Sequence, residues 1–205
     1  MTTQGKKEMK KQPGKATVLL VTKNSHKVRE IGMIMEEYGI KVKQHRADKS
    51  EHAEWSTEKT ARVNAEFFSR KTGMPVIVDD SGIEFEAYPG FPGSNPRWLF
   101  ERIGYDGIMR LLKGKSRRAA FKCSAGFCMP HSKPIVRNGF MRGKISEAPK
   151  YMDRNVMPYE RIFIPDEADD VLAALSREKK NMISHRSRAF RKLARIIAKT
   201  LKVTA

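Results

Sequence analysis

The order of apolar and polar positions predicts strands and helices that alternate in the first half of the chain. Residues 17–22, with the sequence TVLLVT, are apolar and β-branched, as in a buried strand. A polar loop follows, and apolar residues then recur at helical spacing until Gly39, which would end a helix. The same signals predict a strand at 40–45, a helix capped by Ser56 or Thr57 that runs to about Thr72, and a strand at 75–78.

In the second half of the predicted pattern, the strands lie between two sets of helices. Residues 88–96 are rich in Pro and Gly and predict a loop. The remaining predicted elements are two short helices at 98–103 and 107–113, strands at 118–128, 134–142 and 144–147 that form an antiparallel meander, a short strand at 161–164, and helices at 168–176 and 184–201. This mixed order favours an α/β or α+β fold with one sheet and helices on both sides.

Length and composition indicate a soluble globular chain. Its 205 residues fit one large domain or two packed lobes, and the mean hydropathy is −0.57. No apolar run approaches the roughly 20 residues of a transmembrane helix, and no secretory leader is recognisable, so we expect a cytoplasmic protein without membrane contact. Cys123 and Cys128 would lie on one strand, where a disulfide is hard to form, and are expected to be buried thiols.

Charge is concentrated at the two ends of the chain. The net charge of +18 favours a polyanionic partner, such as nucleic acid, a membrane surface or a phosphorylated small molecule. Residues 1–16 carry five lysines and one glutamate with little to bury, which indicates a flexible basic tail. Residues 177–202 carry ten basic residues and one acidic residue on a predicted helix. Because positive and negative charges nearly balance in the middle of the chain, nucleic acid is not the expected partner.

Three segments combine unusual composition with a plausible site geometry. Residues 22–27 join a strand to a helix N-terminus, which suits a phosphate, although plain helix capping uses the same residues. Residues 79–82, Asp-Asp-Ser-Gly, place two carboxylates at the end of a buried strand, where they could hold Mg²⁺ or simply form a turn. Residues 179–186 set a helix cap beside cationic side chains, which could bind an anion or form a solvated face.

Other familiar sites are excluded. The GKS sequence at 114–116 lacks the first glycine of a Walker A loop, because Met109 stands at that position. Cys123, Cys128 and His131 lack zinc-ligand spacing and a fourth ligand.

Taken together, the polar segments resemble one known family in order and spacing. The matching motifs are Thr22-x-Asn24-x-x-Lys27 between a strand and a helix, Asp79-Asp80-Ser81-Gly82 after a strand, Gly90-Phe-Pro-Gly93, and Ser184-His185-Arg186. On these motifs the chain resembles the inosine triphosphate pyrophosphatase family over about 17–201. The resemblance implies an α/β fold with an elongated mixed sheet and flanking helices, whose two lobes enclose a nucleotide cleft. It also implies a single two-lobed domain over 17–205 after the tail, Mg²⁺ dependence and a homodimer.

The resemblance also implies roles for individual residues, carried over position by position. The substrate-binding residues would be Thr22, Lys23, Asn24, Lys27, Ser81, Arg97, Tyr159, Glu160, Lys180, His185 and Arg186. Thr22, Asn24 and Lys27 would hold the triphosphate. Ser81 and Arg97 would face the phosphates, and the last three residues of the list would recognise the base or sugar.

Metal binding and catalysis would centre on Asp80. By the resemblance, Asp80 would hold Mg²⁺ and act as the base toward water, with Lys27 assisting. The second metal ligand would be Glu51 or Glu54, of which we choose Glu51.

The implied function is Mg²⁺-dependent hydrolysis of non-canonical purine nucleoside triphosphates (ITP, dITP, XTP) to the monophosphate and pyrophosphate. Such a house-cleaning enzyme removes these nucleotides from the cellular pool. The alternative is a catalytically weak relative that binds nucleotide or RNA. It is motivated by Lys23, where the family has glycine, and by the sequence Met157-Pro-Tyr-Glu-Arg161, where the family has Phe-Gly-Tyr-Asp-Pro.

Overall fold

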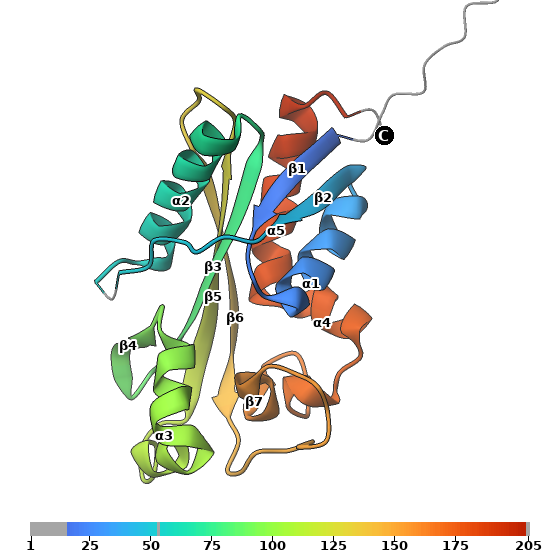
Figure 1. The fold of residues 1–205 in the computed structure, drawn as a ribbon. Coiled ribbons are helices and arrows are strands. Elements are labelled where there is room, and N and C mark those ends of the chain that lie inside the picture. The colour runs from blue at the N-terminus through green and yellow to red at the C-terminus, as the bar shows by residue number, and fades with distance from the viewer. Residues whose placement is uncertain (1–15, 53, 204–205) are drawn as a thin grey trace, which may run out of the picture.

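The structure of the protein, a computed structural model, describes residues 16–52 and 54–203 (Figure 1). The predicted basic tail therefore lies, apart from Ala16, outside the described residues.

One seven-stranded mixed sheet organises the described chain. Its strands are β1 (Ala16–Val21), β2 (Ile40–His45), β3 (Val76–Phe85), β4 (Tyr88–Gly93), β5 (Arg118–Cys128), β6 (Ile135–Ile145) and β7 (Phe163–Pro165). They follow the order β2-β1-β3-β5-β6-β7, with β4 paired to β3 off this path. β1 pairs in parallel with β2 and β3, and the other pairs are antiparallel.

Helices cover both faces of the sheet (Figure 1). The helices are α1 (Ser25–Glu36), α2 (Thr57–Thr72), α3 (Pro96–Leu111), α4 (Arg177–Ile183) and α5 (His185–Thr200), with short 3₁₀ helices η1 (Pro158–Arg161) and η2 (Leu172–Ala174). α2 lies against one face, and α1 and α5 lie against the other. None of the helices in the described ranges is long and apolar enough to cross a membrane.

Local sequence signals set the helix ends. The Ser56 side chain caps α2 by accepting from the backbone N–H of Lys59, and Gly73 ends that helix in the left-handed conformation. In α3, Gly104 has a φ of 59° and kinks the helix, which explains the two short helices that the pattern predicts there.

Two main cores lie at opposite ends of the long strands. The first packs α1 and α5 against the sheet around Leu20, Ile77 and Phe190. The second lies at the other end, where Phe85, Phe121 and Phe163 pack together with α3. Because β3 and β5 run through both cores, the residues midway along β3 lie between them.

The end of β1 positions the acidic residues. β1 pairs with β3 only as far as Val21, which lies opposite Val78, whereas β3 continues along β5 to Phe85. Asp79 and Asp80 therefore lie just beyond the end of β1, next to the loop that enters α1.

The α/β fold class is confirmed, and several predicted elements are wrong in detail. Residues 79–82 do not end a strand or form a turn, because pairing with β5 keeps them extended in the middle of β3. The predicted loop at 88–96 contains β4, and the two strands predicted at 134–147 are one, β6. The helix predicted at 168–176 is only η2, and the pattern missed α4.

Candidate active site

The loop between β1 and α1 is held by its own polar side chains. Asn24 caps α1, since its Oδ1 accepts from the backbone N–H of His26 at 2.9 Å. Thr22 Oγ1 in turn accepts from the Asn24 N–H at 3.1 Å. Lys23 points outward and pairs with the exposed Asp48. The structure thus shows the capping function of this loop directly.

Asp79 is a fully buried carboxylate between two cations. Lys27 Nζ lies 2.5 Å from its Oδ2, and Arg186 Nε lies 3.0 Å from its Oδ1. Burial alone would raise the pKa of Asp79, but Lys27 and Arg186 outweigh burial and hold that pKa well below its usual range. Ser81 and Cys123 also donate to Asp79 Oδ1. Asp79 is therefore ionised at all physiological pH values.

Asp80 has a different environment, because successive side chains of a strand point to opposite faces. Its Oδ1 lies 3.3 Å from Lys49 Nζ, and its Oδ2 is buried without a hydrogen-bond partner. Burial, as the largest effect, raises the pKa of Asp80 to about 6, with Lys49 and Lys27 acting against it. The group therefore changes its protonation near neutral pH.

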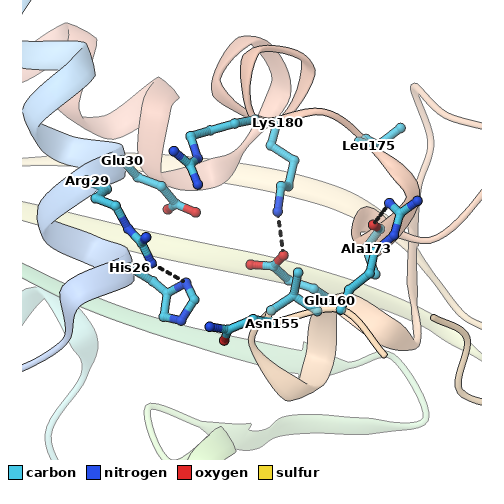
Figure 2. A pocket seen from close by; sticks show the side chains of 11 residues that line it. His26, Arg29, Glu30, Asn155, Glu160, Ala173, Leu175 and Lys180 are labelled. Atoms are coloured by element: carbon cyan, nitrogen blue, oxygen red, sulfur yellow. Dashed lines mark hydrogen bonds and ion pairs between the residues drawn. The ribbon is translucent and has the colours of Figure 1, made fainter. Parts of the chain in front are cut away.

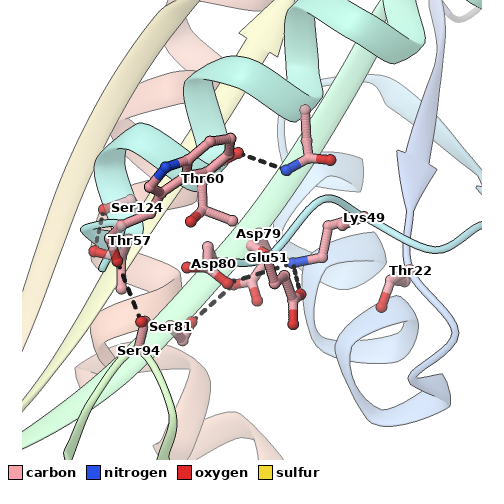
Figure 3. A network of polar contacts seen from close by, with 12 residues as sticks. Thr22, Lys49, Glu51, Thr57, Thr60, Asp79, Asp80, Ser81, Ser94 and Ser124 are labelled. Atoms are coloured by element: carbon pink, nitrogen blue, oxygen red, sulfur yellow. Dashed lines mark hydrogen bonds and ion pairs between the residues drawn. The ribbon is translucent and has the colours of Figure 1, made fainter. Parts of the chain in front are cut away.

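Asp80 and Glu51 approach one common point (Figure 3). Lys49 Nζ lies 2.9 Å from Glu51 Oε1 as well as near Asp80. Glu54 instead lies 3.8 Å from His52 Nδ1, so Glu51 is the acid that faces Asp80. Glu51 is also the second metal ligand that the resemblance predicts in preference to Glu54.

The donor set fits a hard divalent cation. Two carboxylates and a buried, unpartnered oxygen on Asp80 suit Mg²⁺, which takes one or two carboxylates together with substrate phosphates and water. Within the described ranges no cluster of three His, Cys, Asp or Glu side chains is placed to hold a metal, so the substrate would have to complete the coordination.

A cavity of about 190 Å³ lies on the α1 side of the sheet (Figure 2). Glu160 from η1 and Lys180 from α4 line it and form an ion pair of 2.7 Å. His26, Arg29 and Glu30 of α1 line the opposite wall. The cavity therefore carries a buried acid and base on one side and a polar helix on the other.

Two other predicted base-reading residues are buried structural groups. Arg186 pairs with Glu30 at 2.5 Å as well as with Asp79, and burial does not prevent these acids from raising its pKa further. The His185 ring stacks on Phe121 with 4.7 Å between centroids. Burial, aided by Arg186, holds the pKa of His185 well below its usual value, so the ring is neutral.

Tyr159 and Arg97 lie apart from the other predicted residues. Tyr159 is buried, its hydroxyl has no hydrogen-bond partner, and burial raises its pKa. Arg97 is exposed on α3 and pairs with Glu101 at 2.7 Å. The structure therefore brings together the residues of the α1 loop, β3 and α5, and it leaves Arg97 and Lys23 at the surface.

The sequence reasoning missed Lys49 and Glu30. Lys49 stands two residues before Glu51, and Glu30 follows Lys27 by one helical turn. The spacing of Glu30 was a usable signal, because residues three apart on a helix share a face. Lys49 gave no such signal, since its partners Asp79 and Asp80 are 30 and 31 positions away.

The chain is similar in sequence to known proteins. The model of the Ham1 family matches residues 18–196. A protein named dITP/XTP pyrophosphatase from Methanopyrus kandleri is 38% identical over 178 residues, which cover 86% of this chain and 94% of that protein. One of the same name from Pyrobaculum aerophilum is 37% identical, with 86% and 93% covered.

Solved structures show the same fold. The Ham1 protein of Staphylococcus aureus superposes with a TM-score of 0.74 at 23% identity, covering 90% of this chain and 99% of that one. A HAM1 protein from Coxiella burnetii gives a TM-score of 0.73 at 22% identity, with the same coverage.

Proposed function

The chain belongs to the Ham1 family, and from that premise we propose that it hydrolyses dITP, XTP and ITP to the nucleoside monophosphate and pyrophosphate. The predicted family and enzyme class are confirmed: the chain is a nucleoside triphosphate pyrophosphatase. Its proposed role is to remove these purine nucleotides from the nucleotide pool.

The observation that carries this proposal is the position of Asp80. It lies beside the end of β1 and faces Glu51, while its neighbour Asp79 is tied to Lys27 at the start of α1. A phosphate chain at the α1 N-terminus would therefore lie next to the carboxylates of Asp80 and Glu51, which can share a cation. The helix dipole and the charge of Lys27 both favour an anion there.

Glu51 and Asp80 would hold Mg²⁺, which when bound neutralises phosphate charge. Thr22, Asn24 and Lys27 would bind the triphosphate, and Ser81 would contact it. Asp80 would accept the proton of the attacking water, because its pKa of about 6 leaves it ionised yet still basic near neutral pH. Arg97 and Lys23, both exposed, would contact only the outer phosphates.

Selection of the base would rest on Lys180 and Glu160, which line the cavity. Keto purines present an acceptor at position 6 and an N1–H donor, whereas adenine lacks both. Lys180 can only donate and ionised Glu160 can only accept, so this pair matches a keto purine. Arg186 would fix one wall of the cavity through its ion pair with Glu30, and His185 would hold the start of α5 against Phe121. Tyr159, the neighbour of Glu160 in η1, would help to position Glu160.

The proposed active unit is a cytoplasmic homodimer of a two-lobed domain spanning 17–205. Exposed apolar side chains support it, because a second copy could remove them from water; they are Phe91 of β4 and Trp98 and Ile103 of α3.

The test is pyrophosphate release from ITP, dITP, XTP and ATP, with Mg²⁺ and again after EDTA. We expect turnover of the keto purines at least about a hundredfold above ATP, because unmatched donors reject adenine, and loss of turnover with EDTA. Nucleotide binding without pyrophosphate release would overturn the proposal in favour of a binding protein. Equal turnover of ITP and ATP would overturn the role of Lys180 and Glu160.

A further inference from the structure

Lys49 occupies the point that the proposed cation would need. Its side chain is only 10% exposed, and its Nζ is surrounded by three oxygens. These are the backbone carbonyl of Asp79 at 3.0 Å, Asp80 Oδ1 at 3.3 Å and Glu51 Oε1 at 2.9 Å (Figure 3). An ammonium has three N–H donors, so this set of acceptors satisfies it fully.

The surroundings of Lys49 resemble those of a bound ion rather than those of a surface lysine. Two carboxylates and a carbonyl are hard oxygen donors, which is also the kind of ligand that Mg²⁺ takes. Without a positive charge between them, Asp80 and Glu51 would repel each other, and Asp80 is buried. The Lys49 ammonium therefore provides the charge that the two acids need while no metal is bound.

We propose that Lys49 is a tethered cation that holds the Asp80–Glu51 site in the free enzyme, and that a divalent metal must displace its ammonium to bind. This inference rests on the metal site of the proposed function. Two cations cannot share the position, because like charges a few ångströms apart repel strongly at a partly buried site.

The local chain allows the displacement. Lys49 lies between β2 and α2, outside any helix or strand, and its four-carbon stem can turn without moving the sheet. The triphosphate that arrives with the metal gives the displaced ammonium a new anionic partner. Metal and nucleotide binding are therefore coupled through Lys49, and each strengthens the other.

Binding of Mn²⁺ in the absence of nucleotide tests the proposal. Free Mn²⁺ is measured by electron paramagnetic resonance during titration of the wild type, Lys49→Met and Lys43→Met. Lys43 is an exposed lysine of β2, so its removal is a matched loss of one positive charge. We expect Lys49→Met to bind Mn²⁺ about tenfold more tightly than the wild type, and Lys43→Met to bind like the wild type.

A second comparison measures the coupling. A non-hydrolysable ITP analogue should tighten Mn²⁺ binding strongly in the wild type and much less in Lys49→Met, because the competitor is already gone. Lys49→Arg, which keeps the charge, should bind Mn²⁺ as weakly as the wild type. Unchanged or weaker Mn²⁺ binding by Lys49→Met, or equal tightening by Lys43→Met, would overturn the proposal.

Failure of the metal site itself gives a different result. If Asp80→Asn in the Lys49→Met background still binds Mn²⁺ as tightly as Lys49→Met, the metal lies elsewhere and the proposed site is wrong. Should Lys49→Met be unfolded without metal, circular dichroism is recorded during Mn²⁺ addition. Folding induced by Mn²⁺ supports the proposal, and a chain that stays unfolded overturns it.

Discussion

Two adjacent aspartates of β3 have separate tasks because the strand turns their side chains to opposite faces. Asp79 is fully enclosed and neutralised by Lys27 and Arg186, so it joins β3 to the starts of α1 and α5. Asp80 has one oxygen without a partner and a pKa raised to about 6, mainly by burial. The environment of Asp79 therefore suits a role in stability, and that of Asp80 suits a role in catalysis.

Asp79→Asn should therefore destabilise the fold. The substitution leaves the buried Arg186 and the partly buried Lys27 without their shared anion, and breaking such a buried pair costs about 3–5 kcal/mol. Urea unfolding at neutral pH measures this loss, with the exposed Asp169→Asn as control. Because the folded-state pKa of Asp79 is lowered, its contribution is present above pH 3.8 and is lost as the pH falls through that lowered pKa. The gap between wild type and variant should narrow in acid, and a gap that widens would contradict this assignment.

Asp80→Asn should remove turnover and leave the protein folded. The amide keeps the shape of the side chain but loses the charge that holds the metal and accepts a proton. Pyrophosphate release and circular dichroism are measured on the same sample. Near-normal activity in this variant would show that another group is the base.

At the scale of elements, the contact of α5 with β6 depends on one glycine. A Cβ at Gly139 would lie 2.5 Å from the backbone nitrogen of Ala189 and would also collide with the carbonyl oxygen of His185. Both contacts are backbone atoms, so the start of α5 would have to move. That start carries His185 and Arg186, which pack against the centre of the sheet.

We expect Gly139→Ala to lower the free energy of unfolding by about 1–3 kcal/mol through overpacking. It should also reduce turnover, since the displaced helix carries Arg186 away from Asp79. Gly32→Ala is the control, because nothing lies within 4 Å of a Cβ there and α1 gains by about 0.5–1 kcal/mol from alanine. Equal effects of the two substitutions on thermal unfolding would refute the close contact.

The sequence predicts an element well when neighbouring residues determine it and poorly when residues far along the chain determine it. The predicted helix with a cap at Ser56 or Thr57 and an end at about Thr72 rests on local signals, and it is confirmed by α2, which Ser56 caps and which ends at Thr72. The course of β3 through Asp79 and Gly82 could not be predicted, because local turn residues are overruled by pairing with β5, some 40 residues away. The same holds for Lys49, whose site contacts exist only in the folded chain.

At the scale of the whole molecule, several of the 41 Lys and Arg residues are paired with acidic side chains. The basic C-terminal helix α5 uses Arg191 to bind Glu37 at the end of α1, and Arg188 to bind Glu167. These arginines join distant parts of the chain. In the segment 179–186, for which a solvated basic face was the alternative, Lys180 and Arg186 are likewise paired with acids. A nucleic-acid groove would leave such side chains free for phosphates.

Positive charge is also concentrated in residues 1–14. Deletion of these residues tests whether turnover depends on them. Every described element begins at Ala16 or later, so the deletion removes no residue of the sheet or of the candidate site. It does remove four lysines and one glutamate, which add to long-range attraction of an anionic substrate. We therefore expect kcat to be unchanged and KM to rise by at most a few-fold at low salt, an effect that physiological salt should screen. A large fall in kcat at all salt concentrations would instead place this segment in contact with the substrate or the active site.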